Sequence, residues 1–357
     1  MARQFVDYGP SWVMPFAAPY SALVRDGARA WSSGMLALDG DGQVCSPGDV
    51  IAQARLIAAR IGPLLAEAGL TPDSVSRLVL YSAPPLPEAR REIEAVFCAA
   101  LGHTPMIEIV PVPHFHYAGI ELAVDVHCAP AEAVIENALP GGGRARVMRE
   151  PGAIVLNLAA PVSSIGQALG GVLSLHRLSP DRLLSGWGIA PEPMLSAVPG
   201  QIAPRLPGFF VGALMPCYKG DDQAHLYLTF GEGEIELFES REGLVRLHLA
   251  RAGNLAVLDG RYLGGAGVGL AEQTEVVMAG LAATLETHGL AFTDVVKSTT
   301  FYAGRNTAED LHANMAVRNA RYRKPGPAST GVPIARMADP GAKVRIELVL
   351  RPADDAP

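Results

Sequence analysis

Glu121 and Glu347 each lie in the short motif Ile-Glu-Leu within a β-rich segment. Glu121 lies in AGIELAVDV (residues 118–126), and Glu347 lies in KVRIELVLR (residues 343–351). Successive side chains on a strand alternate between its two faces, so each glutamate points away from its apolar neighbours. Such a carboxylate can position or deprotonate a water molecule, or it can be a solvated group on a strand face. His225, in QAHLYL, has a comparable place in the middle of the chain and could act as a general base.

Three further patterns are typical of ordinary structure. HFHY (residues 114–117) sets two histidines on one side of an extended segment, but no third metal ligand accompanies them, which favours loop histidines near a cleft. GGAGVG (residues 264–269) lacks the Lys-Ser/Thr of a phosphate-binding loop and predicts a flexible turn. The cysteines form no Cys-x-x-Cys pair and are expected to be buried free thiols: Cys45, Cys98, Cys128 and Cys217. We therefore expect neither a metal nor a cofactor.

Composition limits the class of protein and its partners. The chain has 357 residues, of which 49% are hydrophobic, enough for a soluble globular protein with two or three cores. Its net charge of -7 comes from scattered acids and bases, so a nucleic-acid partner is not expected. No basic region followed by an apolar run opens the sequence, and the longest apolar stretches are too short to span a bilayer. We expect a cytoplasmic protein that does not interact with membranes.

The sequence repeats itself at a separation of 220 residues. Residues 50–70 and 270–290 both show apolar residues at three- and four-residue intervals and a glycine at the same place, Gly69 and Gly289, which predicts two matching amphipathic helices. Each helix precedes a β-rich run, a second helix and a pair of strands, and each follows β-like segments. Internal repeats of this kind indicate a duplicated module. Each copy predicts the order β-β-α-β-α-β-β, an α+β fold of about 120 residues.

The hundred residues between these copies predict a third, reduced copy. LSPD (residues 178–181) echoes LTPD (residues 70–73), and the order of elements is kept. The first helix is expected to be about half as long, and a Pro-rich loop is expected in place of the second helix. The predicted domains are residues 1–128, 129–231 and 232–357. No Gly/Ser linker or charge run separates them, so we expect one compact assembly.

The third copy resembles the RidA superfamily, also called YjgF or UK114, nearly from end to end. The resemblance rests on FTDVVKSTTFYAG, LHANMAVRNARY and the segment from KPGPASTGVP to VRIELVL. The first copy carries the early signature APYSALVRDGARAWSSGMLALD. RidA proteins are trimers of one such chorismate-mutase-like fold, so three fused copies imply a single-chain pseudotrimer, monomeric or a dimer of such chains.

The resemblance also implies a cleft between adjacent copies that binds a small 2-imino or enamine acid and hydrolyses it without a cofactor. Tyr20 matches the tyrosine of the family's Pro-Tyr-Ser segment, and Ser33 with Gly34 matches its Ser-Gly pair. Asn314 matches the asparagine of the second helix, and Glu121 and Glu347 match the glutamate of the last strand. We expect Glu347, Tyr20 and Glu121 to be catalytic, with Ser33, Gly34, Asn314, Ser329 and His225 binding the substrate.

The chain departs from the family at the arginine that binds the substrate carboxylate. The positions that correspond to it are Ile107, Phe209 and Ser329 in the three copies. Losing a bidentate contact with a carboxylate costs binding free energy, since charge-assisted hydrogen bonds contribute about 1.5–3 kcal/mol each. Another cation is expected to replace it, or the substrate differs; the candidates nearest in sequence are Arg336, Arg261 and Arg305.

These features predict a RidA-like deaminase, hydrolase or lyase that acts by acid/base catalysis on a small carboxylated metabolite with an enamine, imine or enol-ether group. Two alternatives stay open. One is a chorismatase-like enzyme that cleaves an enolpyruvyl ether, a branch similar to fused RidA copies. The other is a binding or scaffold protein whose clefts are degenerate. Whether a cleft gathers a cation, a carboxylate and a hydroxyl distinguishes the enzymes from the binding protein.

Overall fold

The structure, a computed structural model, describes residues 2–9, 17–83, 89–206, 214–217, 222–265, 267–305 and 307–352. The first unit contains β1 (Gln4–Val6), β2 (Leu23–Asp26), β3 (Arg29–Ser32), β4 (Met35–Leu36), α1 (Val50–Glu67), β5 (Val75–Ser82), α2 (Ala89–Leu101), β6 (Met106–Pro111) and β7 (Leu122–Cys128). The second contains β8 (Ile135–Leu139), β9 (Gly143–Glu150), β10 (Ala153–Pro161), α3 (Ile165–His176), β11 (Leu183–Pro191), α4 (Val198–Ile202), β12 (Leu214–Cys217) and β13 (Gln223–Gly231). The third contains β14 (Glu236–Glu242), β15 (Val245–Ala252), β16 (Leu255–Tyr262), α6 (Leu270–Thr287), β17 (Val295–Tyr302), α7 (Ala308–Asn319), β18 (Ala328–Pro333) and β19 (Val344–Leu350).

The three units share one sheet topology. Their strand orders are β1-β2-β3-β7-β5-β6, β8-β9-β10-β13-β11-β12 and β14-β15-β16-β19-β17-β18, which correspond strand for strand. In each unit the last two strands of this order are parallel, and a helical connection joins them; these pairs are β5 with β6, β11 with β12 and β17 with β18. The predicted α+β class and three-unit arrangement are therefore confirmed. We keep the limits 1–128, 129–231 and 232–357 as proposed domain boundaries.

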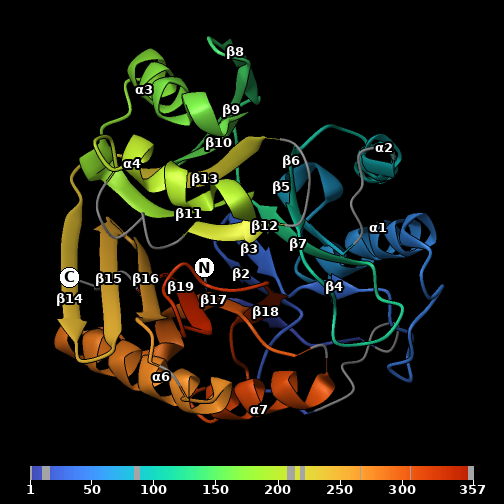
Figure 1. Ribbon diagram of the computed structural model, residues 1–357. Coiled ribbons are helices and arrows are strands. Elements are labelled where there is room, and N and C mark those ends of the chain that lie inside the picture. The colour runs from blue at the N-terminus through green and yellow to red at the C-terminus, as the bar shows by residue number, and fades with distance from the viewer. Residues whose placement is uncertain are drawn as a thin grey trace.

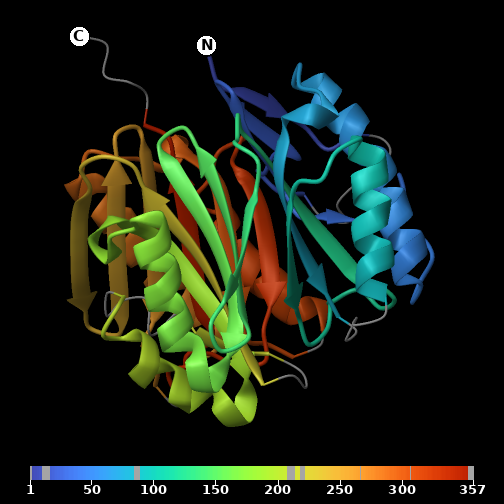
Figure 2. The same ribbon diagram turned by 90° about the horizontal axis from the view of Figure 1, so that it is seen from above.

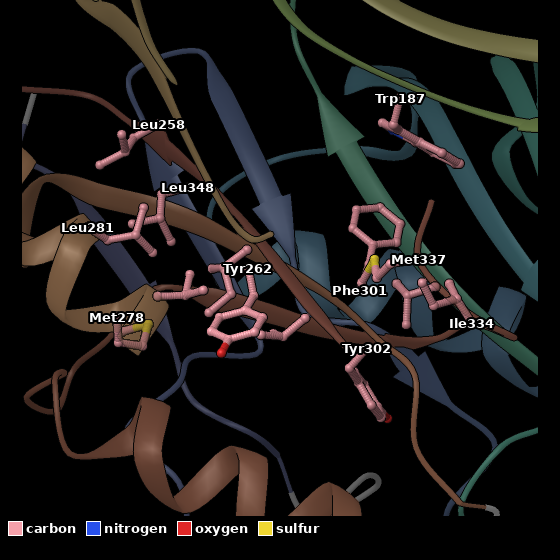
Figure 3. Packing of buried hydrophobic residues seen from close by; sticks show 14 of the residues in the cluster. Trp187, Leu258, Tyr262, Met278, Leu281, Phe301, Tyr302, Ile334, Met337 and Leu348 are labelled. Carbon is pink, nitrogen blue, oxygen red and sulfur yellow. The ribbon is translucent and has the colours of Figure 1, made fainter. Parts of the chain in front are cut away.

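The helices cover the outside of the molecule and the sheets face one another inside (Figure 1). Helices α1 and α2 cover the first sheet, α3 and α4 the second, and α6 and α7 the third (Figures 1 and 2). A cluster of buried residues in the middle has members from all three units, among them Tyr81, Trp187 and Phe301. Trp187 of the second unit and Phe301 of the third lie with ring centroids 5.3 Å apart (Figure 3). Burial of such rings is a large part of what holds the units together.

The repeated helices begin and end where the sequence signals predict. The Asp49 side chain accepts a hydrogen bond from the Ala52 amide at 2.9 Å and caps α1. Just beyond the helices, Gly69 and Gly289 have φ of 65° and 66°, a conformation that glycine adopts at little cost. The 220-residue repeat is therefore kept in the backbone geometry.

A buried glutamine on each long helix fixes the chain that enters the last strand. Gln53 accepts from the Glu121 amide at 2.8 Å and donates to the Gly119 carbonyl at 2.6 Å. Gln273 likewise accepts from the Lys343 amide at 2.7 Å and donates to the Gly341 carbonyl at 2.8 Å. Buried polar groups need such partners, so both glutamines lock equivalent loops. Glu121 therefore corresponds in space to Lys343.

Two expectations about the elements are corrected. Each unit has an additional edge strand, β1, β8 or β14, before the β-β-α-β-α-β-β order, and the first unit also has the two-residue strand β4, which pairs with β7. The middle unit's first helix is shortened, with 12 residues against 18 in α1 and α6. Its second helix is not replaced by a loop: a 3-10 turn over 192–197 leads into the short helix α4. Prolines at the first positions of a helical turn are compatible with it, which explains the difference.

The expectations about membrane-spanning segments and about the cysteines can also be compared with the structure. Within the described ranges, no helix is long and apolar enough to cross a membrane. Cys45, Cys98 and Cys128 are free thiols, of which only Cys128 is fully buried, and the Cys217 side chain lies outside the described residues. Phe209 also lies outside them.

We predict that His248, on β15, makes folding sensitive to acid. It is 2% exposed, and burial lowers its pKa from 6.5 to about 4. Since the unfolded chain takes up a proton near pH 6.5 and the folded chain does not, the free energy of unfolding must fall as pH drops from 6.5 towards 4. At pH 4.5 the loss from this residue is about 2–3 kcal/mol. Urea unfolding at pH 7.5 and 4.5 should show a smaller loss in His248→Asn, and equal losses in the two proteins would contradict the prediction.

Candidate functional site

A cleft lies between the first and third units, with a volume of about 80 Å³. The first unit lines it with Tyr8, Ala18, Tyr20, Gly34, Leu36, Phe115, His116, Tyr117, Ile120 and Ala123. The third unit lines it with Tyr302, Leu311, Met315, Arg318, Ser329, Thr330, Gly331 and Pro333. Of these described residues, Arg318 is the one carrying a positive charge, and none is Asp or Glu. The cleft is thus an aromatic and apolar space with one cation.

Helix α7 points Arg318 into the cleft. Its buried residues are Leu311, Asn314, Met315 and Arg318, at the spacing of one face of a helix. Arg318 is 1% exposed, and the side chains that accept hydrogen bonds from it in the described part of the chain, Asn314 and Ser329, are neutral. Burying an arginine without a counter-charge is costly, and a ligand's anionic group would repay that cost.

Neighbouring polar groups hold Arg318 in place. Its Nε donates to Asn314 Oδ1 at 2.8 Å, and Asn314 Nδ2 donates to Thr274 Oγ1 at 2.6 Å. Thr274 in turn donates to the Leu270 carbonyl at 2.7 Å, which ties the guanidinium to α6. A weaker contact of 3.4 Å joins Arg318 Nη1 to Ser329 Oγ. Asn314 thus orients the cation rather than lining the cleft itself.

Ser33 and Gly34 lie where the first and third units join. Ser33 Oγ donates to the Ser21 carbonyl at 2.7 Å and accepts from the Ser329 amide at 2.8 Å. The Gly34 amide donates to the Ser329 carbonyl at 3.3 Å, and an added Cβ at Gly34 would come within 3.0 Å of Thr330. Ser33 is therefore fully bonded within the protein, while Gly34 leaves space at the wall of the cleft.

Aromatic side chains close the cleft. Tyr20 is 2% exposed and meets Tyr322 edge to face at 5.6 Å; burial raises its pKa. His116 stacks on Tyr302 with centroids 5.3 Å apart, and Tyr117 Oη lies 3.2 Å from His312 Nε2. The loop that carries HFHY thus reaches from the first unit over the third, as expected for histidines near a cleft mouth. No group of three metal-binding side chains occurs in the described part of the chain.

Glu347 lies elsewhere, in a central cavity of about 100 Å³ bordered by all three units. It accepts from Ser185 Oγ of the second unit at 2.5 Å and from Arg345 at 3.2 Å. The strand registers show which residues correspond. Glu347 pairs with Thr299 on the neighbouring strand. Asp125 pairs with Val79, which lies 220 positions before Thr299 and is its counterpart in the repeat, so Asp125 is the counterpart of Glu347. The predicted match between Glu121 and Glu347 is therefore wrong, because register and not the Ile-Glu-Leu motif sets equivalence.

Asp125 has a role in the centre like that of Glu347. Its Oδ1 lies 3.0 Å from Lys297 Nζ of the third unit, and both side chains are 2% exposed. Glu121, by contrast, precedes β7 and lies in a more open depression with His114, which adjoins the cleft and shares Phe115, His116, Tyr117 and Ile120 with it. The central carboxylates thus join units.

The remaining predicted residues are spread over the molecule. In the second unit His225 pairs with Ile189, and at the equivalent place in the third unit Arg345 pairs with Phe301. His225 therefore corresponds to Arg345 rather than to Glu347. Arg336 is exposed and pairs with Glu192 at 3.0 Å. Arg305 is exposed and pairs with Asp310, while Arg261 lines a depression on the far side of the third unit with Arg246 and Asp339. The structure brings together Tyr20, Gly34 and Ser329 at the cleft, with Ser33 and Asn314 directly behind its walls.

Sequence reasoning missed Arg318. The signal was present, since residues 311, 314, 315 and 318 form one face of the predicted helix and Arg318 alone is charged among them. Its direction toward the cleft depends on how α7 packs, which the pattern does not contain.

Comparisons with known proteins find similarity to about one third of the chain. The sequence profile described as Endoribonuclease L-PSP matches residues 247–351, nearly all of the third unit. Among solved structures, the chain is similar to a member of the YjgF/YER057c/UK114 family from Mycobacterium tuberculosis, with 26% identity, a TM-score of 0.30, and coverage of 36% of this chain and 98% of that one. It is also similar to RidA from an Antarctic Psychrobacter, with 19% identity, a TM-score of 0.31, and coverage of 35% and 98%. A third is TdcF from E. coli with bound serine, with 19% identity, a TM-score of 0.30 and the same coverage. No curated protein gave a significant match.

Proposed function

We propose that the chain is a relative of the RidA superfamily and that it binds a small carboxylated metabolite in the cleft between its first and third units; the profile match over residues 247–351 and the lining of the cleft support this. The observation that carries this proposal is Arg318, a buried cation at the cleft wall whose side-chain hydrogen-bond acceptors among the described residues are neutral. The arginine of the family is replaced in the third unit by Ser329, which lies on β18, whereas Arg318 lies on α7. The Arg318 guanidinium nevertheless lies 3.4 Å from the Ser329 hydroxyl. It can supply the lost charge at nearly the same place.

An enzyme of the imine, enamine or enol-ether class is the second candidate, and His116 favours it. Its Nδ1 faces the Thr307 carbonyl at 3.0 Å, so this nitrogen carries the proton and Nε2 keeps a lone pair. Such a nitrogen can accept a proton during a reaction. In this proposal Tyr20 is the accompanying hydroxyl, and the protein acts in the cytoplasm as a monomeric three-unit chain or a dimer.

Isothermal titration calorimetry with paired ligands tests the binding proposal. The panel consists of pyruvate, 2-oxobutanoate and benzoate, each paired with its neutral amide. We expect at least one acid to bind at least tenfold more tightly than its amide, because only the acid pairs with Arg318. Equal affinity for acids and amides, or no binding by any acid, would contradict a carboxylate site.

A variant of Glu347 tests whether the ligand binds in the cleft between the first and third units or in the central cavity. Glu347→Gln should leave the affinity of the cleft for its best acid within twofold, because Glu347 lies in the central cavity and bonds to Ser185 and Arg345. The same calorimetry measures this. A tenfold or larger loss of affinity in a variant that keeps its circular dichroism spectrum would place ligand binding at the centre instead.

A further inference from the structure

The shape and lining of the cleft restrict the ligand further than a carboxylate alone. Tyr8, Tyr20, Phe115, Tyr117 and Tyr302 contribute rings to its wall, and Leu311 and Met315 contribute apolar side chains. At roughly 10–15 Å³ per water molecule, 80 Å³ has room for about six waters, which suits a small ring-bearing acid. Aromatic walls stack best on a flat ring, so a two- or three-carbon acid would leave most of this surface without contact.

A second polar group borders the cleft far from Arg318. His116 contacts the Thr307 carbonyl, at the beginning of α7, whereas Arg318 is in the last turn of this helix. Eleven residues separate positions 307 and 318, which is about 16 Å along a helix. The Arg318 side chain shortens this span because helical side chains lean toward the N-terminus. Leu311 and Met315 lie between the two polar groups.

His116 offers a hydrogen-bond acceptor with nothing bound to it. Its Nε2 is buried and has no hydrogen-bond partner among the described residues. Burial, with His114 nearby, lowers the pKa of His116 to about 4, so the ring is neutral near pH 7. A buried acceptor without a partner is costly, and a ligand that donates a hydrogen bond would satisfy it. An acid without a hydrogen-bond donor would leave this acceptor unsatisfied.

We propose that the cleft binds a carboxylic acid built on a flat ring that also bears a hydroxyl or amino group, with the carboxylate on Arg318 and the donor on His116. The hydroxybenzoates are the simplest members of this class. This inference rests on the proposed function, because it assumes that Arg318 receives the carboxylate. It adds the ring and the donor, which a binding site for simple 2-oxo acids does not require.

Calorimetry at pH 7.5 with benzoate and with 2-, 3- and 4-hydroxybenzoate tests the proposal in the wild-type protein and in two variants. In the wild type, at least one hydroxybenzoate is expected to bind about tenfold more tightly than benzoate. In His116→Phe this advantage should shrink to less than twofold, while benzoate affinity changes little, since a phenyl ring keeps the stacking on Tyr302. His114→Phe is the matched control: the His114 ring packs edge to face on His116 at 5.3 Å but does not line the cleft, and because phenylalanine keeps a ring there, the variant should keep the tenfold advantage.

The outcomes of these titrations distinguish failure of this inference from failure of the proposed function. If His116→Phe weakens benzoate and hydroxybenzoate equally, or if the advantage persists in this variant, His116 is not the acceptor and the inference fails. If pyruvate or 2-oxobutanoate binds and no ring acid does, the inference fails while the proposed function stands. If no acid of either kind binds, both fail. His116→Gln, which can still offer an acceptor, should recover part of the advantage and guards against an unfolded His116→Phe.

Discussion

Replacing Lys297 with methionine should lower the free energy of unfolding by about 3–5 kcal/mol, the cost expected when one partner of a buried ion pair is removed. Lys297 Nζ lies 3.0 Å from Asp125 Oδ1, and it donates to the Ser32 carbonyl at 2.7 Å and to Thr330 Oγ1 at 2.6 Å. Burial lowers the lysine's pKa and the aspartate opposes this. Methionine keeps the volume and leaves Asp125 buried without its counter-charge.

A double variant and a surface variant make this prediction specific. Lys297→Met combined with Asp125→Leu should recover most of the stability, because replacing both partners of a buried pair with apolar groups is often neutral. Arg336→Met, which removes an exposed pair with Glu192, should cost less than about 1 kcal/mol. Urea unfolding followed by circular dichroism measures all three. A cost for Lys297→Met no larger than that of Arg336→Met would show that the central pair does not hold the first and third units together.

Replacing Arg318 with methionine should weaken the best-binding small carboxylate by about a hundredfold. Two charge-assisted hydrogen bonds are lost, each contributing about 1.5–3 kcal/mol, and tenfold in affinity corresponds to about 1.4 kcal/mol. Arg318→Lys should lose about tenfold, because an ammonium group keeps the charge but not the planar fork. Titration calorimetry gives both values.

Arg321→Met is the matched control for Arg318. Arg321 follows α7 by two residues, is partly exposed and pairs with Glu275 at 2.5 Å, so its removal should change affinity less than twofold. If Arg318→Met keeps a folded spectrum and binds the acid as tightly as Arg321→Met does, Arg318 is not the carboxylate anchor. The proposed function would then lose the observation on which it depends.

The sequence determined the repeated elements of this protein because their signals are local. Helical periodicity, the glycines at 69 and 289 and the 220-residue separation are properties of neighbouring residues, and the structure keeps all of them. The edge strands β1, β8 and β14 were missed since such strands are short or largely exposed and carry little apolar alternation. The proline-rich part of the middle unit was assigned to a loop because proline is compatible with the first turn of a helix as well as with a turn.

The placement of the candidate site was decided by tertiary structure. Glu121 and Glu347 share a tripeptide, yet β7 and β19 pair in registers that make Asp125 the counterpart of Glu347. Arg318 meets Tyr20 and Gly34 only because the third unit packs against the first, nearly 300 residues away in sequence. Local composition therefore fixes which elements form, whereas strand register and packing between units fix which side chains share a cavity, because both depend on contacts between residues far apart in the chain.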